Sequence, residues 1–159
     1  MSLFDRRFLL CLPLALAACG FTPVYGTGGT GSRLQNNVEV AEPETRDAYL
    51  LTRRIEERLG RASVAAYKLT LTVDTDEEDI AVDQAGDITR FNLLGSADYA
   101  LIDQATGQVV TSGSVDNFTS YSATGTTVAT LAAQRDAQQR LMTLLGDMIV
   151  LRLLSADLS

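Results

Sequence analysis

Apolar positions after residue 44 follow first a helical period and then a strand period. Within residues 45–59 they recur every three or four positions, which predicts an amphipathic helix; these positions are Ala48, Leu51, Ile55 and Leu59. Acidic residues near its predicted start and arginines near its end complement the helix dipole. Gly60 follows as the expected C-cap. A short strand is expected before this helix, at residues 38–40, with linker as the alternative interpretation of those residues.

Three strands are expected next. Strict alternation of apolar and polar residues over 67–73 predicts a half-buried strand. Because the apolar face changes by Ile80 and Val82, we expect an irregularity within residues 74–79. Gly86 marks a hairpin turn over 83–87, and a long strand with alternating apolar residues over 91–101 follows. A further turn at 103–107 leads to a fourth strand over 109–121.

The chain ends in a predicted long helix that begins at Thr126 or Thr127, either of which can cap it. One apolar stripe contains Ala133, Ala137, Leu141, Leu144, Met148 and Leu151, and it is widened by Met142, Leu145 and Ile149. Such a stripe is typical of a helix packed on a sheet. The alternative is a surface that faces a partner or lipid.

The order of these elements is strand, helix, three strands and helix, which predicts an α+β fold. We expect two helices packed on one face of a four-stranded mixed β-sheet, since that arrangement buries both apolar stripes. A helix between the first two strands permits a parallel pair, whereas the later hairpins are antiparallel. Residues 38–159 are expected to form this single domain.

The N-terminus has the features of an export signal. Arg6 and Arg7 precede an uncharged apolar run over 8–18, which is too short to span a bilayer as a helix. The sequence Leu16-Ala17-Ala18-Cys19 resembles the bacterial lipobox. This resemblance implies a signal peptide over 1–18, an acylated Cys19, and a lipidated N-terminus and flexible tether over 19–37. Gly20 after the cysteine implies the outer membrane, on its periplasmic side. An ordinary signal peptide is the alternative.

Charge and residue usage exclude several function classes. Without Asp5, Arg6 and Arg7, the chain has 11 basic and 19 acidic residues, a net charge of −8, which disfavours nucleic-acid binding. It contains no histidine, and Cys11 is lost with the signal. Serine–histidine and cysteine–histidine catalysis and histidine–cysteine zinc sites are thereby excluded. We expect no cofactor, no metal and no enzymatic activity.

A run of acids is the remaining candidate for chemistry; it contains Asp74, Asp76, Glu77, Glu78 and Asp79. A glycosidase needs two carboxylates across a cleft, which a single run does not provide. The spacing also fails the EF-hand pattern, because Asp79 stands where that loop needs glycine. The run is interpreted as a solvated, charged strand end.

The mature chain resembles the LptE family of lipopolysaccharide-assembly lipoproteins over almost its full length. The resemblance starts with Cys19-Gly20-Phe21-Thr22-Pro23-Val24-Tyr25-Gly26 and continues through the order of the elements to Ala132-Ala133-Gln134-Arg135-Asp136-Ala137. It implies two helices on a four-stranded sheet. It also implies that the protein is a plug inside the outer-membrane β-barrel LptD. Such a plug assists the assembly of the barrel and helps to deliver lipopolysaccharide to the outer leaflet. A different envelope complex and a small hydrolase are the alternatives.

The resemblance also raises the question of lipopolysaccharide contact. Better-known relatives have a basic residue in the central hairpin turn, whereas this chain has none between Asp83 and Asp87. Arg90 is the nearest base, and Lys68 lies on the polar face of the neighbouring strand, so these two are the candidate phosphate ligands. Their alternative role is surface charge pairing. Because the net charge opposes an anionic ligand, we expect weak or indirect binding.

Overall fold

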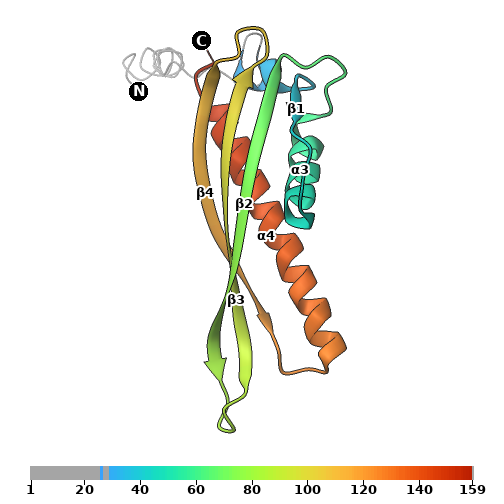
Figure 1. The fold of residues 1–159 in the computed structure, drawn as a ribbon, viewed down its shortest axis with the longest axis vertical. Helices are drawn as coiled ribbons and strands as arrows, with labels where there is room; N and C mark the ends of the chain where they lie inside the picture. The colour runs from blue at the N-terminus through green and yellow to red at the C-terminus, as the bar shows by residue number, and fades with distance from the viewer. Residues whose placement is uncertain (1–25, 27–28, 159) are drawn as a thin grey trace, which may run out of the picture.

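The computed structural model describes residue 26 and residues 29–158 (Figure 1). A short helix α2 and a short strand β1 come first, followed by helix α3, three long strands and the long helix α4. The elements are α2 (Thr30–Leu34), β1 (Val38–Val40), α3 (Arg46–Leu59), β2 (Tyr67–Val82), β3 (Ile88–Asp103), β4 (Val109–Ser122) and α4 (Thr127–Ser155).

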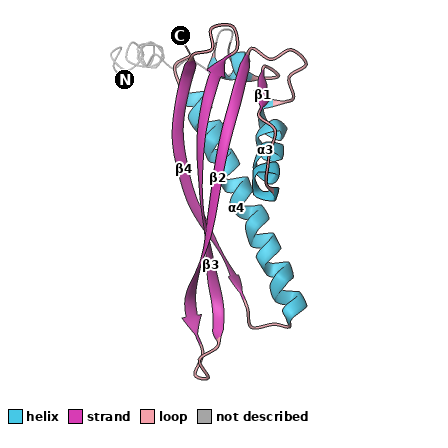
Figure 2. Ribbon diagram, viewed as in Figure 1, coloured by secondary structure: helices cyan, strands magenta, loops and turns pink. Residues whose placement is uncertain are grey.

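The four strands form one mixed sheet in the order β1-β2-β3-β4. β1 pairs with β2 in parallel, as the intervening helix allows, and the two later pairs are antiparallel. Helices α3 and α4 lie together on one side of the sheet (Figure 2). The predicted α+β class is thus confirmed, with α2 as an additional short helix.

The ends of both long helices are fixed by capping residues. Thr45 caps α3 by accepting a hydrogen bond from the amide of Ala48, and Thr126 caps α4 in the same way through Ala129. α3 ends at Gly60, whose φ of 77° is a conformation that favours glycine. A Cβ there would also meet the side-chain oxygen of Asn36, which adds to the preference for glycine.

Both predicted hairpin turns are present. In the β2–β3 turn, the carboxylate of Asp83 accepts from the amides of Ala85 and Asp87, and Gly86 has a φ of 93°. In the β3–β4 turn, Asp103 accepts from the amides of Ala105 and Thr106. The backbone amide of Thr106 is the main cause of a lowered pKa at Asp103.

The predicted irregularity in the second strand lies at a different place. β2 pairs with β3 without interruption through residues 74–79, and the register shifts come only between Asp79 and Val82. The prediction of a break within 74–79 is therefore wrong. The acidic run remains extended because β3 pairs with every one of its residues, whichever face each side chain occupies.

α4 buries only one side of the predicted apolar stripe. The predicted residues that are buried are Ala137, Leu141, Met142, Leu145 and Ile149. Leu141, Leu145, Ile149 and Leu153 are fully buried, whereas Leu144 is 40% and Leu151 is 65% exposed. Four residues turn a helix by about 400°, so a buried row with a spacing of four winds slowly around the axis. Such a row follows the twisted sheet, which a stripe with a spacing of 3.5 does not do.

The core lies between the helices and the sheet, at the end where α3 covers α4. Its fully buried side chains include Leu51, Ile55, Leu69 and Leu101. α2 closes this end: Leu34 is fully buried, and Thr30 and Arg33 donate side-chain hydrogen bonds to the carbonyls of Ala156 and Leu158. The expected tether over 19–37 thus does not extend to residues 30–34, which are part of the folded domain.

Candidate interaction surface

Side chains of the three long strands alternate between two faces of the sheet. Odd-numbered residues of β3 from Leu93 to Leu101 point toward the helices and are buried. Their register partners on β2 and β4 are also odd-numbered, and so point the same way. Even-numbered residues form the other face, over which the described part of the chain places no helix (Figure 2).

This uncovered sheet face is mostly polar and acidic. Four consecutive rows across β2, β3 and β4 form its centre. They are Thr72–Asp98–Ser114, Asp74–Ser96–Asp116, Asp76–Leu94–Phe118 and Glu78–Asn92–Ser120. A shallow hollow of about 330 Å³ lies over the second and third rows. The face therefore combines five carboxylates with one apolar pair, Leu94 and Phe118.

The alternation also divides the acidic run of β2 between the two faces. Asp74, Asp76 and Glu78 belong to the uncovered face, whereas Glu77 points to the helices and accepts hydrogen bonds from Tyr121 and Gln134. No group of three possible ligands suited to a metal ion occurs among residues 29–158. The run is thus two sets of carboxylates with different surroundings.

The two predicted phosphate ligands lie far apart on the uncovered face. Lys68 pairs with Ile102 and Arg90 pairs with Ala81, so 13 strand positions separate them along β2. At about 3.3 Å per residue this is roughly 43 Å. Both side chains are exposed. The structure does not bring Lys68 and Arg90 together, so they cannot grip one phosphate group jointly.

On the helix face, several polar side chains are paired with side chains of other elements. The hydroxyl of Tyr121 donates to Glu77 over 2.7 Å, and its ring stacks on Phe91 with centroids 5.2 Å apart. Burial raises the pKa of Tyr121 above its ordinary value, and the Glu77 carboxylate raises it further. The neighbouring Asp47 accepts from Thr75 and Gln138, and so joins α3 to the sheet and to α4.

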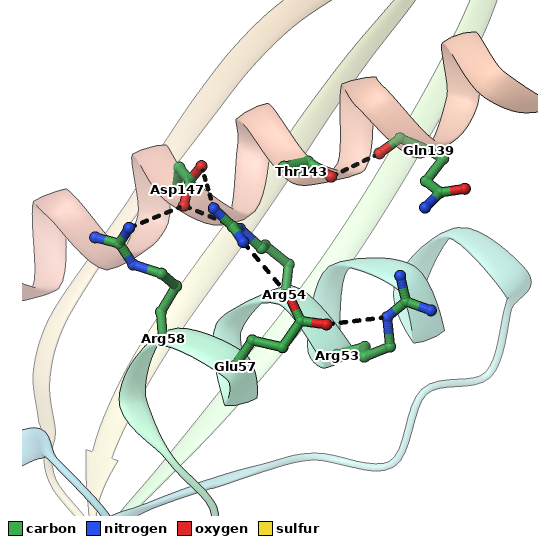
Figure 3. Close-up of polar contacts among 7 residues, drawn as sticks. All are labelled: Arg53, Arg54, Glu57, Arg58, Gln139, Thr143 and Asp147. Atoms are coloured by element: carbon green, nitrogen blue, oxygen red, sulfur yellow. Dashed lines mark hydrogen bonds and ion pairs between the residues drawn. The ribbon is translucent and has the colours of Figure 1, made fainter.

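The two long helices are joined by a set of ion pairs (Figure 3). Arg54 of α3 donates twice to Asp147 of α4, through Nε at 3.1 Å and an Nη at 2.9 Å. This bidentate pair raises the pKa of Arg54, and Glu57 contributes less. Gly146 permits the close approach, because a Cβ there would lie 2.9 Å from Cγ of Arg54. These charges serve helix packing.

Phe118 is a surface residue that the sequence analysis did not single out. It is 58% exposed, although it lies in a strand whose Val115, Thr119 and Tyr121 are buried. Its even position between these odd-numbered core residues is the signal that would have identified it. Cys19, the predicted lipidation site, lies outside the described residues. In the part of the chain that the structure describes, no helix is long and apolar enough to cross a bilayer.

Comparisons with known proteins agree with this architecture. The family model for LptE, lipopolysaccharide-assembly, matches residues 30–153. No curated protein gives a significant match. A solved lipoprotein structure from Caulobacter crescentus CB15 is 32% identical, with a TM-score of 0.68, and the match covers 82% of this chain and 96% of that one.

More distant structures share the fold. Rare lipoprotein B from Shewanella oneidensis has 14% identity and a TM-score of 0.58, with 75% of this chain and 92% of that one covered. A minor lipoprotein from Acinetobacter baumannii has 17% identity and a TM-score of 0.53, with 75% and 89% covered. The family match covers more than half of the sequence, and the Caulobacter lipoprotein, at 32% identity, matches 82% of it. The chain therefore belongs to the LptE family of lipopolysaccharide-assembly lipoproteins.

Proposed function

We propose that this protein is a lipid-anchored plug of an outer-membrane LptD barrel, whose assembly it assists and through which it helps to deliver lipopolysaccharide. The observation that carries the proposal is the LptE match over residues 30–153 together with the complete four-stranded fold. A plug must be compact and polar outside, because large barrels have polar interiors. The uncovered sheet face, with its serine, threonine and aspartate rows, meets that need.

The fold also favours one orientation toward the anchoring membrane. α2 and the C-terminus lie at one end of the molecule, and the β2–β3 hairpin tip lies at the other (Figure 1). Cys19 is ten residues before Gly29, a span of at most about 36 Å. An acyl group on Cys19 would hold the α2 end near the inner leaflet. The hairpin around Gly86, some 50 Å away along β2, would point into the barrel.

Direct lipopolysaccharide binding has a minor place in this proposal. Lys68 and Arg90 are the candidate ligands, and each would contact a phosphate separately because they lie at opposite ends of the face. The carboxylates between them repel anions. Docking into the barrel, rather than tight lipid binding, is then the main activity.

Two measurements on the native protein test the proposal. Mass spectrometry of the mature N-terminus should find an acylated Cys19, and Cys19→Ala should remove the protein from the outer membrane. Affinity purification from solubilised outer membranes should recover an LptD barrel. Recovery of a different envelope complex without LptD, or a free thiol at residue 19, would contradict the proposal.

A further inference from the structure

Carboxylates on the two faces of the sheet have different surroundings. Toward the helices, Asp47, Glu77 and Asp147 each accept hydrogen bonds from side chains of other elements. On the uncovered face no side-chain hydrogen bond or ion pair joins the carboxylates to any other described residue; they are Asp74, Asp76, Glu78, Asp98 and Asp116. Intramolecular hydrogen bonds therefore hold these carboxylates on the helix side of the sheet, whereas those on the uncovered face remain open to solvent or to a partner.

Unpaired acids alone would indicate only a solvated surface, but this face has an apolar centre as well. Phe118 is 58% exposed and lies in one row with Leu94 and Asp76. Together with Asp74 and Asp116 of the next row, these residues line the hollow of about 330 Å³. Aromatic side chains, phenylalanine included, are enriched at protein interfaces, where a few central residues carry most of the binding energy.

The shape of the face suits a protein surface. Near the ring and the acids, several positions carry small side chains, namely Ser96, Ser112, Ser114 and Ala100, which leave the ring and the acids accessible. An arginine can lie over an aromatic ring and bond to carboxylates at the same time, because its guanidinium is planar and has five donors. Phosphate groups, by contrast, would meet five negative charges here.

We propose that the uncovered sheet face is the docking surface for a cationic, arginine-bearing protein wall, with Phe118 at its centre and Asp74, Asp76 and Asp116 around it. The inference rests on the proposed function, in which that wall belongs to the barrel lumen. It deepens that function by naming the face that docks and the charge of its counterpart. The carboxylates at the centre of this face repel the phosphates of lipopolysaccharide.

Competitive assembly in cells tests the docking face. A tagged LptD barrel is co-expressed with equal amounts of the wild-type lipoprotein and one full-length variant, and mass spectrometry gives their ratio in the purified complex. Phe118→Ala should lower the share of the variant about tenfold, as expected for a hot-spot aromatic. The triple variant Asp74→Asn, Asp76→Asn, Asp116→Asn should do the same, because it removes three of the charges that would attract the cationic wall.

Matched controls separate docking from general effects. Glu42, Glu44 and Asp136 are exposed acids away from this face, and their triple change to Gln, Gln and Asn removes the same charge. Leu151→Ala removes an apolar side chain that is 65% exposed on α4. Both controls should assemble in a ratio near one to wild type. Each variant is first shown to unfold at the wild-type midpoint.

The outcomes distinguish failure of the docking face from failure of the plug function. If the barrel recovers wild type and the face variants equally, the docking face is contradicted while the plug function stands. The same holds if the face variants alter only binding to lipopolysaccharide vesicles. If the barrel recovers no lipoprotein at all, both proposals fail.

Discussion

Tyr121 combines burial, ring stacking and a hydrogen bond to a carboxylate in a single residue. Its phenol donates to Glu77, and its raised pKa means that the folded state holds the proton more tightly than the unfolded chain does. The stabilisation that this provides is complete below the unfolded pKa of about 10 and is lost as pH rises above it.

Tyr121→Phe should therefore change how stability depends on pH. The wild-type free energy of unfolding should decline as pH rises from about 10. The variant should start about 1 kcal/mol lower, because it lacks the hydrogen bond, and should decline less steeply. Urea unfolding between pH 8 and pH 11 measures both curves. Parallel curves for the two proteins would contradict the linkage.

Arg54→Ala tests the ion pair between the helices. The Arg54 side chain is 27% and the Asp147 side chain 37% exposed, so solvent screens the pair partly. We expect a loss of about 1 kcal/mol in the free energy of unfolding. Arg53→Ala is the control, since its i,i+4 pair with Glu57 is worth about 0.3 kcal/mol. Equal losses in the two variants would mean that Arg54 joins the helices no more than Arg53 does.

At the residue scale, the sequence predicted the positions that obey local rules. The caps at Thr126 and Gly60 and the turn at Gly86 follow from backbone geometry and were found as expected. The pairing of Arg54 with Asp147 spans 93 residues, and no local pattern encodes it. The same is true of the separation between Lys68 and Arg90, because only the register of the hairpin sets it.

At the scale of elements, the sequence pattern did not fully predict which face of α4 is buried. The second half of this helix is apolar on most sides, so periodicity alone could not choose between adjacent stripes. The elements packed against α4 determine which side chains are buried, since the twisted sheet lies on one side of the helix and α3 on another. The number, type and order of the main elements required no such information and were predicted correctly.

Two leucine substitutions test directly which face of α4 is buried. Leu145 is fully buried against the sheet side, whereas Leu151 was predicted to be in the core and is 65% exposed. Leu145→Ala should cost 2–5 kcal/mol, as core truncations do. Leu151→Ala should cost less than about 0.5 kcal/mol. Thermal and urea unfolding compare the two variants, and a larger loss for Leu151→Ala than for Leu145→Ala would contradict the burial of Leu145 in place of Leu151.

At the scale of the whole molecule, charge is distributed unevenly. Arg53, Arg54, Arg58 and Arg61 of the α3 region pair with acids, whereas the carboxylates on the uncovered sheet face do not. A protein with this distribution has one side suited to an intramolecular core and another suited to a cationic partner. The net charge was visible in the sequence, but its division between faces depends on strand register.

The same charge distribution predicts that lipopolysaccharide binding depends only weakly on Lys68 and Arg90. Lys68→Ala and Arg90→Ala, singly or together, should reduce binding to lipopolysaccharide vesicles by less than about threefold at physiological salt, since exposed single charges contribute little. A hundredfold loss of binding in the double variant would contradict this prediction. It would indicate a shared phosphate site, which the separation of Lys68 and Arg90 by 13 strand positions does not allow.

We propose that this LptE-family domain works by docking in an outer-membrane barrel. Quantitative mass spectrometry of the full-length, lipidated protein purified from solubilised outer membranes tests this most directly. We expect an LptD barrel in about equal molar amount, and its loss with Cys19→Ala. Purification of the lipoprotein alone, or with another complex in place of the barrel, would contradict it.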